Sequence, residues 1–245
     1  MPDSRPARKL QATFWPAVAL LALTLAVSEL TSLDLWVQDF FFDFEQRRWL
    51  VDQAAPVPWL LFYQGPKVVL ILFGLSVLTL IAGPERWRRT FRLQQHRREL
   101  AAVFATLALG PVLIGIGKAK TNLFCPYEIQ RYGGDVPYVR VLESFPDGQM
   151  PTRRGRCFPA GHASGGFALL AVAGLARTRR GQRFGFAIGL SLGLWMGLYQ
   201  MLKGAHYLSH TLVTALLVWM VFLGSRTCIQ ILWPADPPEP SGPGK

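Results

Sequence analysis

The chain has 245 residues, of which 51% are hydrophobic, and its mean hydropathy is +0.24. Soluble domains of this length rarely contain so much apolar sequence, so the composition indicates a membrane protein. The formal net charge is +11, yet no basic domain with interleaved aromatic residues stands apart from the apolar runs. We therefore expect no nucleic-acid partner.

Six apolar runs follow one another along the chain, each close to the length of about 20 residues that a helix needs to cross a bilayer. They cover residues 12–29, 64–82, 100–118, 161–176, 184–202 and 207–223. A buried helix of a soluble protein would explain any one run, but not all six. We predict an all-α, polytopic membrane protein: a bundle of six transmembrane helices with a long periplasmic loop between the third and fourth spans.

Basic residues set the expected orientation, because cytoplasmic loops carry an excess of lysine and arginine. Arg5, Arg8 and Lys9 precede the first run, and arginines fill segments 86–98 and 177–183. We expect those segments and both termini in the cytoplasm and segment 119–159 on the other side. The cysteines of that segment and a composition rich in alanine and arginine favour a bacterial inner membrane, with segment 119–159 in the periplasm.

The chain is expected to form one membrane domain, residues 12–232, without internal repeats. A short cytoplasmic tail, residues 1–11, precedes it, and a proline- and glycine-rich cytoplasmic tail, residues 233–245, is predicted to be disordered. The loop 119–159 is long enough to suggest a function. It carries Lys120, Arg154 and Arg156 against the usual charge bias, and such a cluster attracts anions unless neighbouring acidic residues balance it.

Two of the three cysteines, Cys125 and Cys157, flank this loop, and Cys228 lies in the last span, which is expected to continue beyond residue 223. Paired cysteines outside the cytoplasm commonly oxidise. We therefore predict a Cys125–Cys157 disulfide; two free thiols buried in packing are the alternative.

Three of the four histidines lie in two short polar segments, each joined to an apolar run. The first reads R-C-F-P-A-G-H-A-S-G-G and places His162 in the first turn of the fourth run. The free amides of that turn, at Gly161 and His162, form an anion site together with the helix dipole. An ordinary helix cap with an interfacial histidine is the alternative.

The second polar segment reads K-G-A-H-Y-L-S-H, from Lys203 to His210. If the sixth helix begins near His206, a spacing of four places His206 and His210 on one helix face. Lys118 ends the third run, where a lysine is usually a snorkelling anchor. Beside the two histidine segments, a role in holding phosphate becomes the better interpretation.

These segments resemble the type 2 phosphatidic acid phosphatase superfamily, whose pattern is K-x6-R-P, then P-S-G-H, then S-R-x5-H-x3-D. The order and spacing of the three motifs agree over essentially the whole membrane domain. In this chain the motifs align with Lys118, Cys125 and Pro126; with Pro159, Ala160, Gly161 and His162; and with Tyr199, Gln200, His206 and His210.

The resemblance implies a phosphatase with a periplasmic active site and no metal or other cofactor. By it, His206 is the nucleophile that forms a phosphohistidine, and His162 is the general acid and base. Lys118 and the amide of Gly161 would hold the phosphate oxygens. The implied partner is a lipid phosphate in the bilayer, such as phosphatidate, phosphatidylglycerophosphate, undecaprenyl diphosphate or lipid A. Transfer to water makes a phosphatase, and transfer to a second lipid makes a phosphotransferase.

Several positions depart from the pattern: Cys125 and Gln200 replace the two arginines, Ala160 replaces the serine of the second motif and His210 replaces the aspartate. Gln200 is also expected to bind phosphate. The missing positive charge is expected from Lys203, from Lys120 or from one of Arg153, Arg154 and Arg156. His210 is expected to orient His206, although it brings no negative charge to support an imidazolium.

Two other functions also agree with the sequence. His162, His206 and His210 match the ligand number of a three-histidine zinc hydrolase. A catalytically degenerate lipid-binding or transport protein on the same scaffold is the second alternative.

Overall fold

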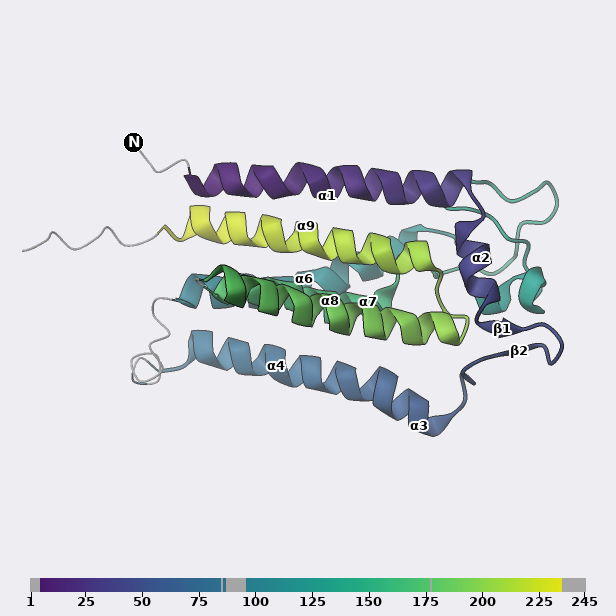
Figure 1. Ribbon diagram of the computed structural model, residues 1–245, viewed down its shortest axis with the longest axis horizontal. Helices are drawn as coiled ribbons and strands as arrows, with labels where there is room; N and C mark the ends of the chain where they lie inside the picture. Colours follow the sequence, from purple (N-terminus) through teal and green to yellow (C-terminus); the bar gives the residue numbers. More distant parts are fainter. Residues whose placement is uncertain (1–4, 85, 87–95, 177, 235–245) are drawn as a thin grey trace, which may run out of the picture.

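The computed structural model describes residues 5–84, 86, 96–176 and 178–234. Within these residues, five helices are long and apolar enough to cross a membrane, and they lie side by side in one bundle (Figure 1). They are α1 (Arg5–Leu30), the continuous helix that ends with α4 (Gly65–Ala82), α6 (Arg97–Lys120), α8 (Arg179–Leu202) and α9 (Leu208–Leu232). The helical, multi-pass membrane architecture predicted from the sequence is confirmed.

The second span begins eight residues earlier than predicted. α3 (Pro56–Trp59) and the π-helical turn η1 (Leu60–Gln64) run directly into α4, so the helical segment covers Pro56–Ala82. Proline at the first helical position suits a helix start, because its missing amide would have no partner there. The π turn interrupts the regular helical hydrogen bonding and makes a backbone carbonyl available to another group.

The fourth predicted span is the exception among the six. α7 (Gly161–Ala168) is followed by the 3-10 helix η5 (Leu169–Leu175), and the two together are shorter than a bilayer requires. This segment packs against α8, whose glycines face it. A Cβ on Gly189 would meet the backbone of Leu170 at 2.3 Å, and one on Gly193 would meet the Phe167 ring at 2.1 Å. Glycines at intervals of four allow this close approach of two backbones.

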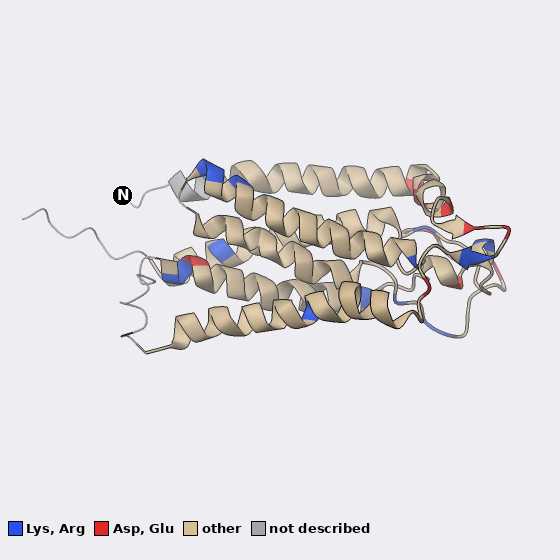
Figure 2. Ribbon diagram, turned by 60° about the horizontal axis from the view of Figure 1, so that its bottom comes forward, with Lys and Arg blue, Asp and Glu red and all other residues tan. Residues whose placement is uncertain are grey.

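One end of the bundle, which we call the loop end, carries α2 (Leu33–Asp39), the two-stranded hairpin of β1 (Phe42–Asp43) and β2 (Arg48–Trp49), and the segment from 121 to 160 (Figure 1). That segment contains the 3-10 helices η3 (Pro126–Glu128) and η4 (Gln130–Tyr132) and is otherwise irregular, as its prolines and glycines predicted. Most of the described acidic residues lie at this end, and basic residues lie at both ends (Figure 2). The orientation in the membrane stays a prediction.

The loop end holds the start of α9 in place. Asp34 of α2 accepts hydrogen bonds from the backbone amide of Ser209 at 2.8 Å and from its hydroxyl at 2.5 Å. These bonds satisfy a free amide in the first turn of α9. Because His206 and His210 flank Ser209, the same contacts position both histidines.

The two predicted tails have different outcomes. α1 begins at Arg5, so part of the segment 1–11 continues the first helix. The tail predicted to be disordered, residues 233–245, lies almost entirely outside the described residues.

Candidate active site

His206 lies in the turn between α8 and α9, with only 4% of its surface exposed. Gly204 in this turn has a φ of +74°, a conformation that favours glycine. A Cβ there would also meet the Trp49 ring at 2.3 Å. The amide of Ala205 donates to the carbonyl of Gln200 at 2.8 Å. The turn is therefore rigid, and it fixes the direction of the His206 side chain.

His162 lies in the first turn of α7, as predicted. Its Nε2 is 3.0 Å from the carbonyl oxygen of Phe62 in the π turn. A carbonyl only accepts, so Nε2 carries the proton and Nδ1 is left to exchange a proton with a ligand. The ring stacks on Tyr63 with a centroid distance of 4.3 Å and an interplanar angle of 10°. His162 is thus held on two sides, with one nitrogen free.

Lys118 reaches the N-terminus of α7 from the end of α6. A Cβ built on Gly161 would lie 3.3 Å from Cδ of Lys118 and 3.5 Å from its Nζ. The ammonium therefore lies against the backbone at the start of α7, where the free amides and the positive end of the helix dipole also favour an anion. A Cβ at this position would press on the lysine side chain.

Lys203 supplies a second buried cation. Its Nζ lies 5.2 Å from the centroid of the Tyr63 ring and 5.0 Å from that of Tyr199, and the residue is 9% exposed. Burial lowers the pKa of Lys203 below its ordinary value of 10.5. Among the described residues it forms no ion pair with a carboxylate. A buried ammonium without a carboxylate partner is expected to bind an anion.

The charges of these residues act on one another. Burial lowers the pKa of His206 well below 6.5, and the positive charges of His210, Lys118 and His162 lower it further. His206 is therefore neutral at neutral pH and has a lone pair available. The charges of His162 and Lys118 thus act on His206.

A pocket of about 550 Å³ opens beside Lys118 and His162 and continues between α4 and α6. Its polar end contains Lys118, Gly161 and His162, together with Tyr63 and Lys67. The rest of its lining is mainly apolar, and it includes Leu70, Ile71, Leu75, Phe104, Leu107 and Pro111. The pocket thus combines a cationic end with an apolar groove between two spans.

A family model described as the PAP2 superfamily matches residues 99–234, more than half of the chain. The chain belongs to the PAP2 superfamily. The resemblance inferred from the three motifs is confirmed. No curated protein and no solved structure matches the chain significantly. The superfamily includes phosphatases that act on lipid phosphates, which agrees with membrane-type helices beside a cationic pocket.

Two residues that depart from the PAP2 pattern, Gln200 and His210, are buried. Gln200, in place of the second arginine, is buried, and its Nε2 has no hydrogen-bond partner. Lys203 lies one helical turn further along and brings a positive charge to the same end of α8. His210, in place of the aspartate, packs edge-on against Phe158 and Tyr207, with a centroid distance of 5.0 Å to each.

His210 is not an evident substitute for a carboxylate. The centroids of its ring and of the His206 ring are 5.9 Å apart, and its buried Nδ1 has no hydrogen-bond partner. It lines a small polar space with Tyr207, Asp34 and Tyr138 and is not among the residues that line the large pocket. A catalytic role for His210 stays a prediction.

The basic residues of the loop lie away from the pocket lining. The guanidinium of Arg154 donates to the backbone carbonyl of Lys120 at 2.8 Å, and Lys120 and Arg156 are exposed. Arg153 pairs with Asp135 at 2.9 Å. The basic residues that line the pocket are instead Lys118 and Lys67, and Lys203 packs against Tyr63 of the same lining. Phosphate binding by Lys120, Arg154 and Arg156 stays a prediction.

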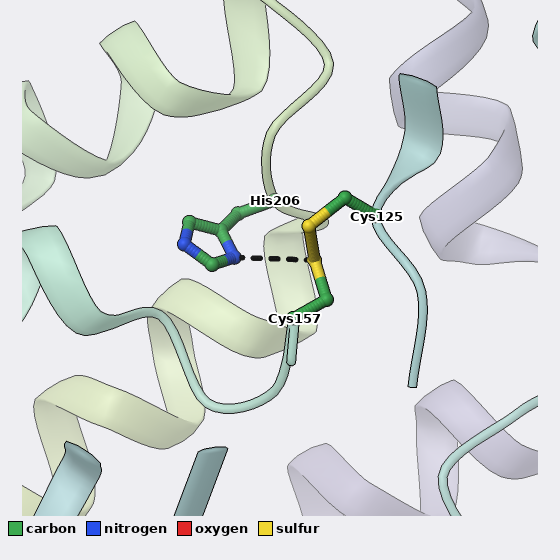
Figure 3. A group of neighbouring side chains, drawn as sticks. All are labelled: Cys125, Cys157 and His206. Carbon is green, nitrogen blue, oxygen red and sulfur yellow. Dashed lines mark hydrogen bonds between the residues drawn. A yellow bond between two sulfur atoms is a disulfide. The ribbon is translucent and has the colours of Figure 1, made fainter. Parts of the chain in front are cut away.

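The predicted disulfide between Cys125 and Cys157 is present, and it lies beside His206 (Figure 3). These three residues are the group of metal-ligand side chains that the described residues bring within 4.8 Å of one another. Both sulfurs are bonded to each other, so neither is a thiolate ligand. The three histidines do not form such a group, so the geometry does not favour the three-histidine zinc alternative.

The part of the site that comes from the second span was not predicted. Phe62 and Tyr63 precede the predicted start of that span, and Lys67 lies inside it. None of the three belongs to a PAP2 motif. A lysine inside an apolar run was the available signal for Lys67, because ionisable residues in a span are costly.

Proposed function

We propose that this protein is an integral membrane enzyme that removes phosphate from a lipid phosphate or diphosphate, or transfers it, through a phosphohistidine. The observation that carries the proposal is the pocket that joins a cationic end, with His162 and Lys118, to an apolar groove between α4 and α6. A lipid fits this shape, with its phosphate at the cationic end and its chains in the groove. A soluble phosphate ester would gain nothing from the groove.

The proposed first step uses the neutral His206. Its Nε2 attacks phosphorus, and the bond from phosphorus to the leaving oxygen breaks. Protonated His162 gives its Nδ1 proton to that oxygen, while its Nε2–H remains on the Phe62 carbonyl. General acid help of this kind contributes about a hundredfold to ten-thousandfold. Lys118, Lys203 and the amides at the start of α7 stabilise the charge on the equatorial oxygens.

In the second step, neutral His162 takes a proton from water at Nδ1. The water oxygen attacks phosphorus, and the bond to His206 Nε2 breaks, which restores the enzyme. A lipid hydroxyl or phosphate in place of water would make the protein a phosphotransferase. The site is proposed to face the periplasm of a bacterial inner membrane.

The test uses detergent-purified protein and a panel of phosphatidate, phosphatidylglycerophosphate, undecaprenyl diphosphate and lipid A, each with and without an acceptor lipid. Released or transferred phosphate is measured. We expect His206→Ala to abolish turnover and His162→Ala to lower kcat by at least about a hundredfold. His96→Ala is the matched control, because His96 lies at the opposite end of α6 from Lys118. Turnover by His206→Ala at the rate of the unaltered protein would refute the mechanism.

Two further measurements separate this proposal from its alternatives. Rapid quenching is expected to trap phosphate on His206 that is labile in acid and stable in base. A chelator is expected to leave activity unchanged, whereas a metalloenzyme would lose it. Phosphate release from no lipid of the panel would favour the degenerate lipid-binding protein.

A further inference from the structure

The Cys125–Cys157 disulfide touches the ring of His206. Nδ1 of His206 lies 3.5 Å from Sγ of Cys157, and the same sulfur lies 3.2 Å from the carbonyl oxygen of Ala205. Both His206 and Cys157 are buried. Figure 3 shows one ring nitrogen facing the disulfide and the other turned away from it.

This contact selects one tautomer of His206. A disulfide sulfur has no proton and is only a weak acceptor, so the contact is favourable when Nδ1 carries the proton. A neutral imidazole has a single N–H, so Nε2 keeps its lone pair.

We propose that the disulfide, through Cys157, is a positioning device that holds His206 in the tautomer whose Nε2 attacks phosphorus. The inference rests on the proposed function of His206. In the PAP2 pattern an aspartate stands at the position of His210, and none of the described carboxylates forms an ion pair with His206. The pattern's first arginine is Cys125 in this chain. Relative to the PAP2 pattern, this site therefore lacks the aspartate and contains the Cys125–Cys157 disulfide.

Reduction should reverse the selection. A dithiol gives two electrons and two protons and becomes a cyclic disulfide, while the S–S bond breaks and two S–H bonds form. Cys125 is partly exposed and Cys157 is fully buried, so attack begins at the sulfur of Cys125. The thiol of Cys157 can then donate to Nδ1, which leaves the imidazole proton on Nε2 and removes the nucleophilic lone pair.

The experiment compares two variants that break the same cross-link. Both carry Cys228→Ser, which removes the exposed free cysteine and serves alone as the reference. Cys125→Ala leaves the thiol of Cys157 beside His206, whereas the double variant Cys125→Ala/Cys157→Ala leaves no sulfur there. Each protein is assayed for kcat and KM with phosphatidate, or with the lipid of the panel that has the highest kcat/KM, and thermal unfolding reports the loss of the cross-link.

We expect Cys125→Ala to lower kcat by about tenfold or more with KM nearly unchanged, because the wrong tautomer impairs the chemical step. The double variant Cys125→Ala/Cys157→Ala is expected to lose less kcat, although both variants lose the same cross-link. Methyl methanethiosulfonate converts the thiol of Cys157 in Cys125→Ala into a methyl disulfide and is expected to restore kcat. It should leave the double variant, which has no thiol, unchanged.

Equal kcat values for the two variants, or no recovery on methylthiolation, would overturn the proposal and reduce the bridge to a structural cross-link. Inactivity of the Cys228→Ser reference on every lipid would instead overturn the proposed function. An active reference whose kcat is unaffected by dithiothreitol, with both loop cysteines shown to be reduced by mass spectrometry, would overturn only the positioning role.

Discussion

Lys203→Met is the sharpest test of how this protein replaces the missing arginine of the PAP2 pattern. The substitution keeps an unbranched side chain of similar length at a position that is only 9% exposed. It removes only the charge and its hydrogen bonds. If Lys203 donates to a phosphate oxygen in the transition state, the loss is that of a charge-assisted hydrogen bond, about 1.5–3 kcal/mol. This corresponds to a decrease in kcat/KM of about 10- to 150-fold.

The stability of the variant should change little. Removing the ammonium loses cation–π contacts with Tyr63 and Tyr199, each worth about 0.5–2 kcal/mol. It also relieves the burial of a charge that has no carboxylate partner among the described residues, which acts in the opposite direction. We expect the free energy of unfolding to change by less than about 2 kcal/mol, a shift in Tm of at most about 8 °C.

The assay is phosphate release from the preferred lipid, with Tm measured on the same samples. Lys203→Arg keeps the positive charge and should lose less kcat/KM than Lys203→Met. Arg179→Met, at the exposed opposite end of α8, is the matched control for removing a positive charge. Unchanged kcat/KM in Lys203→Met would show that Lys203 does not bind the phosphoryl group.

Three further predictions follow from the geometry. Gly161→Ala should lower kcat/KM by about tenfold, because the new Cβ lies 3.3 Å from Cδ of Lys118 and displaces its ammonium. Gly115→Ala, whose new Cβ has nothing within 4 Å, should be active, and equal kcat/KM values for the two variants would contradict this reasoning. Gly193→Ala should destabilise the fold by about 1–3 kcal/mol, since its Cβ would meet an aromatic ring of α7 at 2.1 Å; an unchanged Tm would contradict the close packing. At a pH below 6.5, the ordinary pKa of histidine, the unfolded chain binds a proton at His206, whereas in the folded chain burial lowers that pKa and keeps the ring neutral. The free energy of unfolding should therefore fall as the pH drops below about 6.5. His206→Gln should flatten that loss of Tm, and parallel curves would argue against the lowered pKa.

Local features of the sequence were enough to predict the architecture and the motif residues. Apolar length determines a span without reference to other segments, because the bilayer sets it. The spacing of the motifs identified His162, Gly161 and Lys118, since each lies at a helix end that is readable from nearby residues. The bridge between Cys125 and Cys157 was predictable because its cysteines flank one loop.

Other features depend on packing between segments that are far apart in the chain. The fourth run is shorter than a span, and its close fit to α8 depends on which glycines face it. Phe62 and Tyr63 join His162 across 100 residues, and Lys203 lies against the ring of Tyr63. No local pattern encodes such contacts, because they arise from how helices align in the bundle. The contact between Nδ1 of His206 and the sulfur of Cys157 likewise depends on how the turn before α9 packs against the loop.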